Sequence, residues 1–206
     1  MEKCATLSNL NDEQLVSLYA KGNNEAFDTL LARNQDRVFQ YIHFMVGGNA
    51  DRANDVFQDT FVKAIIAIRE GRYQESGQFA AWLLRIARNL VLDGERSKKA
   101  SRLVSHELVD EEGEVKGNLL NNAALCEPNA EMQMVFQQSL DDVRMMVERL
   151  PEAQREVVVL RFYQEMPFKD IARLTGVSIN TALGRMRYAM LNLRRMAQNR
   201  NLYLVG

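Results

Sequence analysis

The sequence has few of the residues that build disulfide frameworks, metal centres and hydrolytic sites. Its 206 residues include two cysteines and two histidines. Cys4 and Cys126 lie far apart and neither belongs to a Cys-x-x-Cys pair, which argues against a disulfide framework and against a zinc site. His43 and His106 are isolated, so we expect them to be structural or solvated. The sequence contains no Gly-rich phosphate loop and no nucleophile elbow, and we expect no metal, no cofactor and no enzymatic activity.

Long apolar runs are also missing. No stretch approaches the ~20 apolar residues that a membrane-spanning helix needs. Residues 1–9 have no apolar core of the kind found in a secretory signal. We therefore expect a cytoplasmic protein that does not insert into a membrane.

Prolines and glycines are scarce, with three and eleven in the chain, and alternating Val/Ile/Thr runs are rare. Hydrophobic residues make up 47% of the chain, enough for a core, and charged residues make up 26%. This composition predicts an all-α fold. At roughly 100–200 residues per domain, the length allows one large domain or two small ones.

Charge is distributed unevenly along the chain. Residues 1–99 carry 13 basic and 13 acidic residues, residues 100–150 carry 4 and 10, and residues 151–206 carry 9 and 4. No acidic residue follows Asp170, whereas six arginines do. The basic end favours a polyanionic partner, although a solvated helical face gives the same charge pattern.

These charges and the apolar periodicity divide the chain into three segments. We expect a helical N-terminal domain over 10–99, an acidic flexible linker over 100–128 and a helical C-terminal domain over 129–200. In the first domain, Asn11 and Gln14 have the spacing of a capping box. In that domain the expected helices run from Asn11 to Gly22, from after Asn24 to Gly47, from Asp51 to Glu70, and onward from a cap at Ser76. In the C-terminal domain they run from Asn129 to Arg149, from Pro151 to Glu165, from Phe168 to Leu174 and from Ser178 to Asn199.

The last two expected helices have the spacing of a helix-turn-helix. Gly176 supplies the positive φ of a tight turn, and Ser178 is the expected N-cap of the second helix. That helix is expected to bury Ala182, Met186, Ala189 and Leu193. Its exposed residues, which include Gly184 and Arg185, are expected to present amide, hydroxyl and guanidinium groups to a major groove. Any helical hairpin can share the pattern, and the basic stretch after Asp170 is what favours DNA binding. The candidate residues for duplex DNA are Ser178, Asn180, Thr181, Arg185, Arg187 and Tyr188.

The helix expected after Ser76 has a basic face opposite an apolar face that includes Trp82. The preceding loop supplies an aromatic ring and small polar groups, a combination that suits unstacked single-stranded bases. Taken alone, such a face is more often a solvated surface. We expect Trp82 to belong to the core. The candidate residues for single-stranded DNA are Tyr73, Ser76, Arg85, Arg88, Asn89 and Arg96.

The third expected helix exposes Asp55, Gln58 and Asp59. Two carboxylates one turn apart can hold a metal or act as an acid/base pair. No histidine, cysteine or third carboxylate lies at ligand spacing with them, so we prefer a protein-docking face.

In combination, these segments resemble bacterial sigma factors of the extracytoplasmic-function (ECF) type. The resemblance covers roughly residues 10–99 and 130–197. The segments that carry it are Asp55 to Phe61, Phe79 to Asn89 with Asp93 and Arg96, Leu150-Pro151 with Arg155, and Asp170 through Thr181 to Arg185.

The resemblance implies a division of roles between the two domains. Asp55, Gln58 and Asp59 match the face that docks on core RNA polymerase. The helix with Arg88, Asn89 and Arg96 matches the one that reads and melts the promoter −10 element, and the loop from residue 73 to 77 matches the segment that receives a flipped base. The helix-turn-helix matches the reader of the −35 element. The implied partners are core RNA polymerase and promoter DNA, both duplex and melted, and family members often have an anti-sigma factor as well.

Two departures from the family pattern bear on this interpretation. Leu183-Gly184 stands where many members carry a basic residue and a serine, so base reading is expected to shift to Asn180, Arg185 and Arg187. Gly94-Glu95 replaces aromatic or basic residues, which is expected to weaken the positive face of the −10 helix.

Three other classes fit part of the pattern. A DNA-binding regulator with a helical sensor domain shares the helix-turn-helix but gives no role to the face around Arg88 and Asn89. A metal-dependent hydrolase would use Asp55 and Asp59 and needs a third ligand. A pure protein-interaction module would make the basic C-terminal surface incidental.

Overall fold

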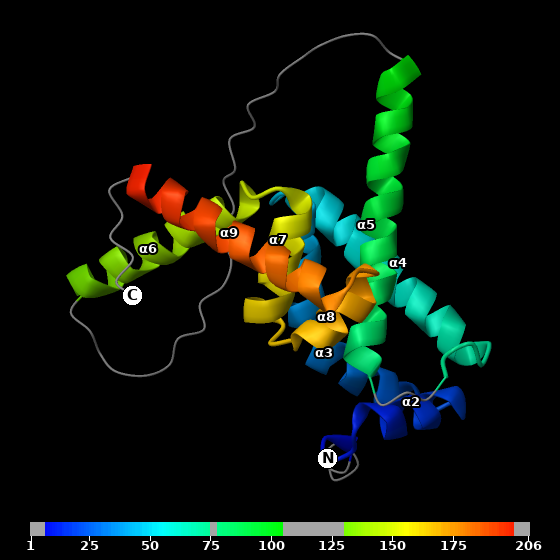
Figure 1. Ribbon diagram of the computed structural model, residues 1–206. Helices are drawn as coiled ribbons and strands as arrows, with labels where there is room; N and C mark the ends of the chain where they lie inside the picture. The colour runs from blue at the N-terminus through cyan, green and yellow to red at the C-terminus, as the bar shows by residue number, and fades with distance from the viewer. Residues whose placement is uncertain (1–6, 75–77, 105–129, 200–206) are drawn as a thin grey trace. The chain divides into compact units, whose positions relative to one another are not determined.

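The structure is a computed structural model that describes residues 7–74, 78–104 and 130–199. Over those ranges every regular element is a helix, which confirms the all-α fold (Figure 1). The chain divides into two compact units, Met1–Glu111 and Glu112–Gly206, and each is described by itself. Most of the expected linker and the expected cap Ser76 lie outside the described residues.

The N-terminal unit is a bundle whose helices begin and end close to the expected positions. Its last helix continues past residue 99, where the expected domain ended. The helices are α2 (Asp12–Ala20), α3 (Asn24–Met45), α4 (Ala50–Arg69) and α5 (Phe79–Val104). In this unit α2 packs on α3, α4 packs on α5, and α3 contacts both α4 and α5.

Asparagine caps fix the starts of three of these helices. The Asn11 side chain accepts a hydrogen bond from the Gln14 backbone N–H at 2.9 Å, and the Gln14 side chain accepts one from the Asn11 N–H at 2.9 Å. This reciprocal pair confirms the predicted capping box. Asn23 and Asn49 cap α3 and α4 with one bond each, because each side chain accepts a hydrogen bond from the backbone N–H three residues further on. Each cap satisfies a backbone N–H that the helix leaves without a partner, which contributes about 1 kcal/mol.

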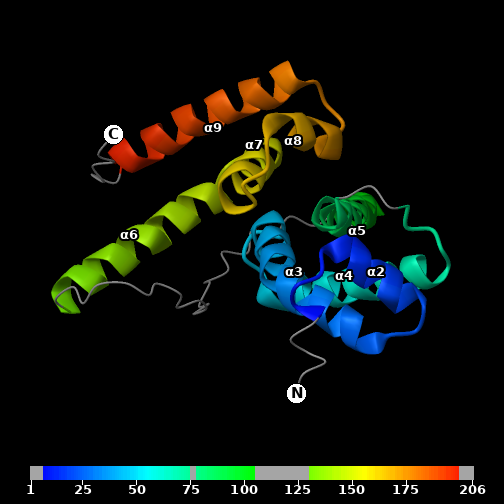
Figure 2. The same cartoon turned by 90° about the horizontal axis from the view of Figure 1, so that it is seen from below.

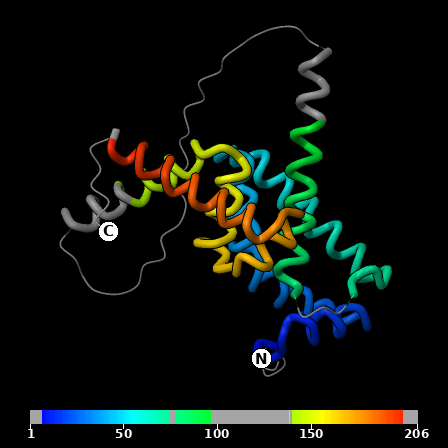
Figure 3. The backbone as a smooth tube through the Cα atoms, in the orientation of Figure 1, coloured from blue at the N-terminus to red at the C-terminus, as the bar shows by residue number. Residues whose placement is uncertain are grey.

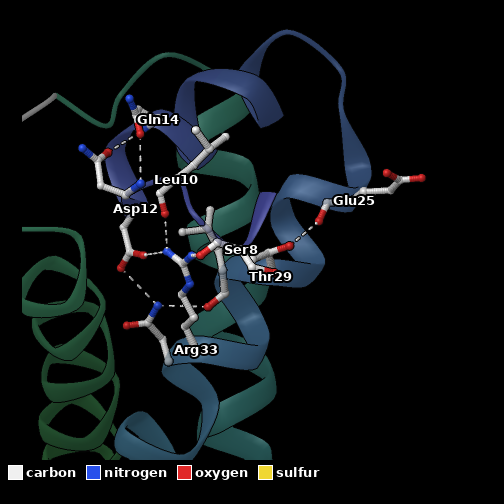
Figure 4. Close-up of polar contacts among 10 residues, drawn as sticks. Ser8, Leu10, Asp12, Gln14, Glu25, Thr29 and Arg33 are labelled. Carbon is white, nitrogen blue, oxygen red and sulfur yellow. Dashed lines mark hydrogen bonds and ion pairs between the residues drawn. The ribbon is translucent and has the colours of Figure 1, made fainter. Parts of the chain in front are cut away.

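Arg33 ties the start of α2 to α3 (Figure 4). One guanidinium nitrogen donates to the Leu10 carbonyl at 2.7 Å and to the Asp12 carboxylate at 3.0 Å. The other donates to the Ser8 carbonyl at 2.6 Å. The segment before α2 is therefore held against α3 by backbone carbonyls that would otherwise face solvent.

The core of the N-terminal unit is built from large side chains. They come from all four helices, because each has apolar residues at a helical period. Ring contacts add to the packing, with the Phe57 and Phe61 centroids 4.9 Å apart. The residues buried completely include Leu15, Leu30, Tyr41, Ile42 and Leu83.

The C-terminal unit joins its last helices by short turns, which Figures 2 and 3 show from two directions. The elements are α6 (Ala130–Glu148), α7 (Glu152–Val158), η1 (Val159–Tyr163), α8 (Phe168–Thr175) and α9 (Ile179–Asn199). Pro151 is the N-cap of α7, so α7 begins one residue later than expected. In this unit α9 packs on α7 and α8, and α6 contacts both α7 and α9.

The segment expected to be one regular helix from Pro151 to Glu165 ends as a π-helix, η1. The Gln164 N–H bonds the Val159 carbonyl at 3.1 Å, and Glu165 then adopts a left-handed φ of 53° that ends the helix. The wider turn leaves Phe162 exposed and Tyr163 half-buried. Burial raises the pKa of the Tyr163 hydroxyl.

Candidate nucleic-acid interface

The turn between α8 and α9 has the geometry that the sequence predicted. Gly176 adopts a left-handed φ of 71° at the end of α8, a conformation that costs glycine little. The Ser178 hydroxyl accepts a hydrogen bond from the Thr181 N–H at 3.0 Å, as an N-cap does. The Ser178 and Thr181 hydroxyl oxygens also lie 2.8 Å apart, so the two groups bond each other.

The outer face of α9 follows the prediction with two corrections. Asn180, Arg187 and Tyr188 are exposed, as expected. Gly184 and Arg185 were expected to be exposed, but both are half-buried. Arg185 lies on the flank between the exposed face and the buried face of the helix, where part of its stem is covered.

The inner face of α9 is lined by alanines. Ala182 and Ala189 are completely buried, as predicted, and Ala197 extends the same face. Met186 and Leu193 were expected in this core and are half-buried. Small side chains let α9 approach its neighbours closely, which keeps the helix-turn-helix compact.

The basic face of α5 lies opposite the core, as predicted. Phe79, Leu83 and Ala87 are buried on the inner side. Arg85, Asn89 and Arg96 are exposed on the outer side, and Arg88 is half-buried at its edge. Arg96 also pairs with Asp93 one turn earlier, at 3.5 Å.

Tyr73 is packed into an aromatic cluster at the start of α5. Its ring stands edge-on to Trp82, with centroids 4.7 Å apart, and to Phe79, at 5.7 Å. Its hydroxyl donates a hydrogen bond to the Glu13 carboxylate of α2. Trp82, expected in the core, is half-buried at the edge of this cluster. Tyr73 is thus anchored to both α2 and α5.

A pairing that the sequence did not predict crosses from α4 to α5. Arg52 forms an ion pair with Glu95, and both side chains are largely covered. A Cβ on Gly94 would lie 3.1 Å from the second terminal nitrogen of Arg52, so the glycine makes room for the guanidinium. Glu95 was expected to weaken the positive face of α5, but Arg52 offsets its charge. No local signal identifies this pair, because its members are 43 residues apart.

The outer face of α4 carries the predicted docking residues. Asp55, Gln58 and Asp59 are all exposed. Val62 and Ile66 continue the same face at spacings of three and four, with 51% and 42% of their surface accessible. The sequence interpretation missed these two. Both are apolar residues at positions that do not belong to the inward-facing apolar period of α4, and this mismatch could have identified them from the sequence.

Within residues 7–74, 78–104 and 130–199, no cluster of three or more histidine, cysteine or acidic side chains could hold a metal ion. Over the same ranges, no helix combines the length and apolar character needed to cross a membrane.

A helix-turn-helix in one unit and a basic helical face in the other are features typical of nucleic-acid-binding proteins. Comparison with known families narrows this class. Residues 30–101 match Sigma-70 region 2, and residues 140–190 match Sigma-70 region 4.

Similar proteins carry the same assignment. The chain is 25% identical over 180 residues to the ECF RNA polymerase sigma factor SigW of Bacillus subtilis, a match that covers 87% of this chain and 92% of SigW. It is 34% identical over 163 residues to the ECF RNA polymerase sigma factor BldN of Streptomyces coelicolor, covering 79% and 57%.

Solved structures agree with the fold. CnrH, solved in complex with the cytosolic domain of CnrY, superposes with a TM-score of 0.62 at 26% identity, covering 91% of this chain and 97% of CnrH. The sigma factor RpoE of Bartonella quintana, solved with the anti-sigma factor NepR, gives a TM-score of 0.63, with 84% and 96% covered. At 19% identity, this second likeness concerns the fold alone.

The chain belongs to the ECF sigma factor family. It acts in promoter-specific initiation of transcription, with core RNA polymerase and promoter DNA as its partners.

Proposed function

We propose that the two units divide promoter recognition between them. The N-terminal unit docks on core RNA polymerase through α4 and opens the −10 element with α5, and the C-terminal unit reads the −35 element with α9. The observation that carries this proposal is the presence of a basic, exposed helical face in each of two separate compact units.

Docking on the polymerase is assigned to Asp55, Gln58 and Asp59. They form an exposed polar stripe on α4, and the core of the unit lies on the opposite side of the helix. Carboxylates on such a stripe attract a basic partner surface and fix its register. The helix beneath them is held by an asparagine cap and a buried apolar face, so the stripe is rigid before the polymerase arrives.

Opening of the −10 element is assigned to Arg85, Arg88, Asn89 and Arg96, with Tyr73 and Ser76 in the preceding loop. The arginines hold the phosphates of the melted strand, and Asn89 contacts a base edge. Extruding a base costs a few kcal/mol of lost stacking, which contacts in the protein offset. This step needs no covalent chemistry, so we assign the protein no catalytic activity.

Reading of the −35 element is assigned to α9. Ser178 and Thr181 engage each other's hydroxyl groups and stabilise the start of the helix. Beside the backbone N–H groups at that start, they contact phosphates. Asn180 and Arg187 are exposed and free to reach base edges. Arg185, which was also expected to read bases, is half-buried, so we assign it to the DNA backbone together with the exposed Tyr188.

The two units bind weakly on their own and tightly together. The net charge of the whole chain is −1, so it has little general attraction to DNA. If about four arginines of the C-terminal unit contact phosphates, the salt slope of its binding is only about −3.6. Docking on polymerase sets the spacing of the units, and the resulting effective concentration multiplies two weak affinities.

We further propose that the protein works in the cytoplasm, where RNA polymerase acts, and that an anti-sigma factor holds it inactive. RpoE of Bartonella quintana was solved in complex with the anti-sigma factor NepR, and CnrH was solved in complex with the cytosolic domain of CnrY. The exposed α4 stripe is the surface we assign to this partner, because covering it would also block the polymerase.

Transcription from purified components tests the proposed function. Core RNA polymerase with the full chain should initiate at specific sites that core polymerase alone does not use. Asp55→Arg should lower the affinity for core polymerase by about tenfold or more, because it reverses a charge at the interface. Asp36→Arg reverses the charge of an exposed residue on α3 and serves as the matched control. Equal binding by both variants would contradict the docking assignment.

A further inference from the structure

One face of α9 carries two polar side chains, one leucine and one glycine in a single stripe. Asn180, Leu183, Gly184 and Arg187 follow one another at the i, i+3, i+4 and i+7 positions of one helical face. Leu183 keeps 45% of its surface accessible, although it is large and apolar. At Gly184 an added Cβ would meet no protein atom within 4 Å, so the space beside its backbone is open.

The stripe lies where a recognition helix meets DNA. The first turns of the second helix of a helix-turn-helix enter the major groove. The flanking charges suit a nucleic acid, because Arg187 adjoins Leu183 and no acidic residue follows Asp170. An apolar side chain in this position therefore faces DNA bases rather than a protein surface of mixed charge.

Leu183 can recognise only one group in that groove. It offers no hydrogen bond, and among the four bases only thymine presents an apolar group there, the 5-methyl. The neighbouring Ser178 and Thr181 side chains are the ones we assign to phosphate contacts at the start of the helix, which leaves the thymine methyl to Leu183.

We propose that Leu183 reads the 5-methyl group of a thymine in the −35 element, and that Gly184 permits the close approach by presenting no side chain. This inference rests on the proposed reading of the −35 element by α9. It makes Leu183-Gly184 the specificity determinant that replaces the polar pair of many relatives.

Replacement of thymine by uracil tests the proposal. A −35 sequence is first selected from a randomised duplex with the full chain bound to core polymerase, and each thymine is then replaced in turn by deoxyuridine. Removing the contacted methyl should weaken binding about fourfold at one position. Leu183→Ala should bind the thymine and uracil duplexes equally. Leu191→Ala, which removes an exposed leucine further along α9, should keep the preference for thymine.

Gly184→Ala supplies a second, independent readout. Alanine favours a helix more than glycine does and has open space here, so the variant should melt at the same or a higher temperature. Its affinity for the selected −35 sequence should nevertheless fall, because the new methyl group occupies space that the DNA needs. Unchanged affinity would contradict the role of Gly184.

The outcomes separate this inference from the function on which it rests. If selection yields a −35 sequence and no uracil substitution weakens binding, Leu183 does not read a methyl group and the proposed function stands. If Leu183→Ala retains the uracil effect, another residue reads the methyl group. If selection yields no preferred −35 sequence, the assignment of α9 to that element is itself wrong.

Discussion

The α5 and α9 helices carry similar basic faces, but the side chains that the two helices themselves bury differ in size. α5 packs through large side chains, among them Phe79, Leu83 and Val91, whereas α9 packs through Ala182, Ala189 and Ala197. The face of α5 is supported by contacts with α3 and α4, and the face of α9 by contacts with α6, α7 and α8.

The surroundings of the two faces differ as well. The α5 face has neighbours that bond to other helices, since Tyr73 contacts Glu13 and Arg52 pairs with Glu95. The α9 face projects Asn180, Arg187 and Tyr188 outward. A surface that must splay and hold single strands benefits from rigid positioning, whereas one that enters a preformed groove needs mainly to be accessible.

The largest loss of stability should follow from removing a large buried side chain in the N-terminal unit. Leu83→Ala deletes a completely buried leucine in a close-packed core, and we expect a loss of about 2–5 kcal/mol in the free energy of unfolding. Urea denaturation measures it. Val62→Ala, at an exposed site on α4, should change stability by less than about 0.5 kcal/mol. A similar loss in both variants would mean that α5 is not packed as described.

A larger side chain on the buried face of α9 should destabilise the C-terminal unit. Ala189→Leu places a branched side chain where α9 lies close to its neighbours, and overpacking of this kind costs about 1–3 kcal/mol. Thermal unfolding measures the cost, and binding to core polymerase through the N-terminal unit should be unchanged. An Ala189→Leu variant as stable as the parent would contradict the close approach of α9.

Breaking the pair between α4 and α5 should have a smaller effect. Arg52→Ala removes the partner of Glu95, and we expect a loss of about 1 kcal/mol, because solvent reaches the 34% of the Glu95 side chain that stays accessible and screens the pair. The double variant Arg52→Ala, Glu95→Gln should recover part of it, since no unpaired carboxylate then remains. Chemical denaturation of both variants gives the comparison, and a double variant less stable than the single would refute the charge argument.

What could be predicted from sequence was local. The capping box of Asn11 and Gln14 and the turn at Gly176 depend on residues within one helical turn of each other, so their patterns sufficed. The basic face of α5 followed from periodicity alone. Arg185 was misplaced, because a residue on the flank of a helix is covered or exposed according to what packs beside it.

What could not be predicted depends on contacts between distant parts of the chain. The pair of Arg52 with Glu95 and the bond from Tyr73 to Glu13 each join residues of different helices. The π-helix that ends at Tyr163 was missed for a related reason. An apolar period does not distinguish a regular turn from a wider one, and tertiary packing decides between them.

The most direct test of the division of labour compares Asn89→Ala and Arg187→Ala on one promoter, in complex with core polymerase. Permanganate reactivity of unpaired thymines reports opening of the −10 element, and filter binding reports promoter affinity. We predict that Asn89→Ala binds the promoter but leaves the −10 thymines unreactive, and that Arg187→Ala loses promoter affinity while any complex that forms still opens. If either variant lost promoter affinity, opening of the −10 element and core polymerase binding together, the account would be contradicted.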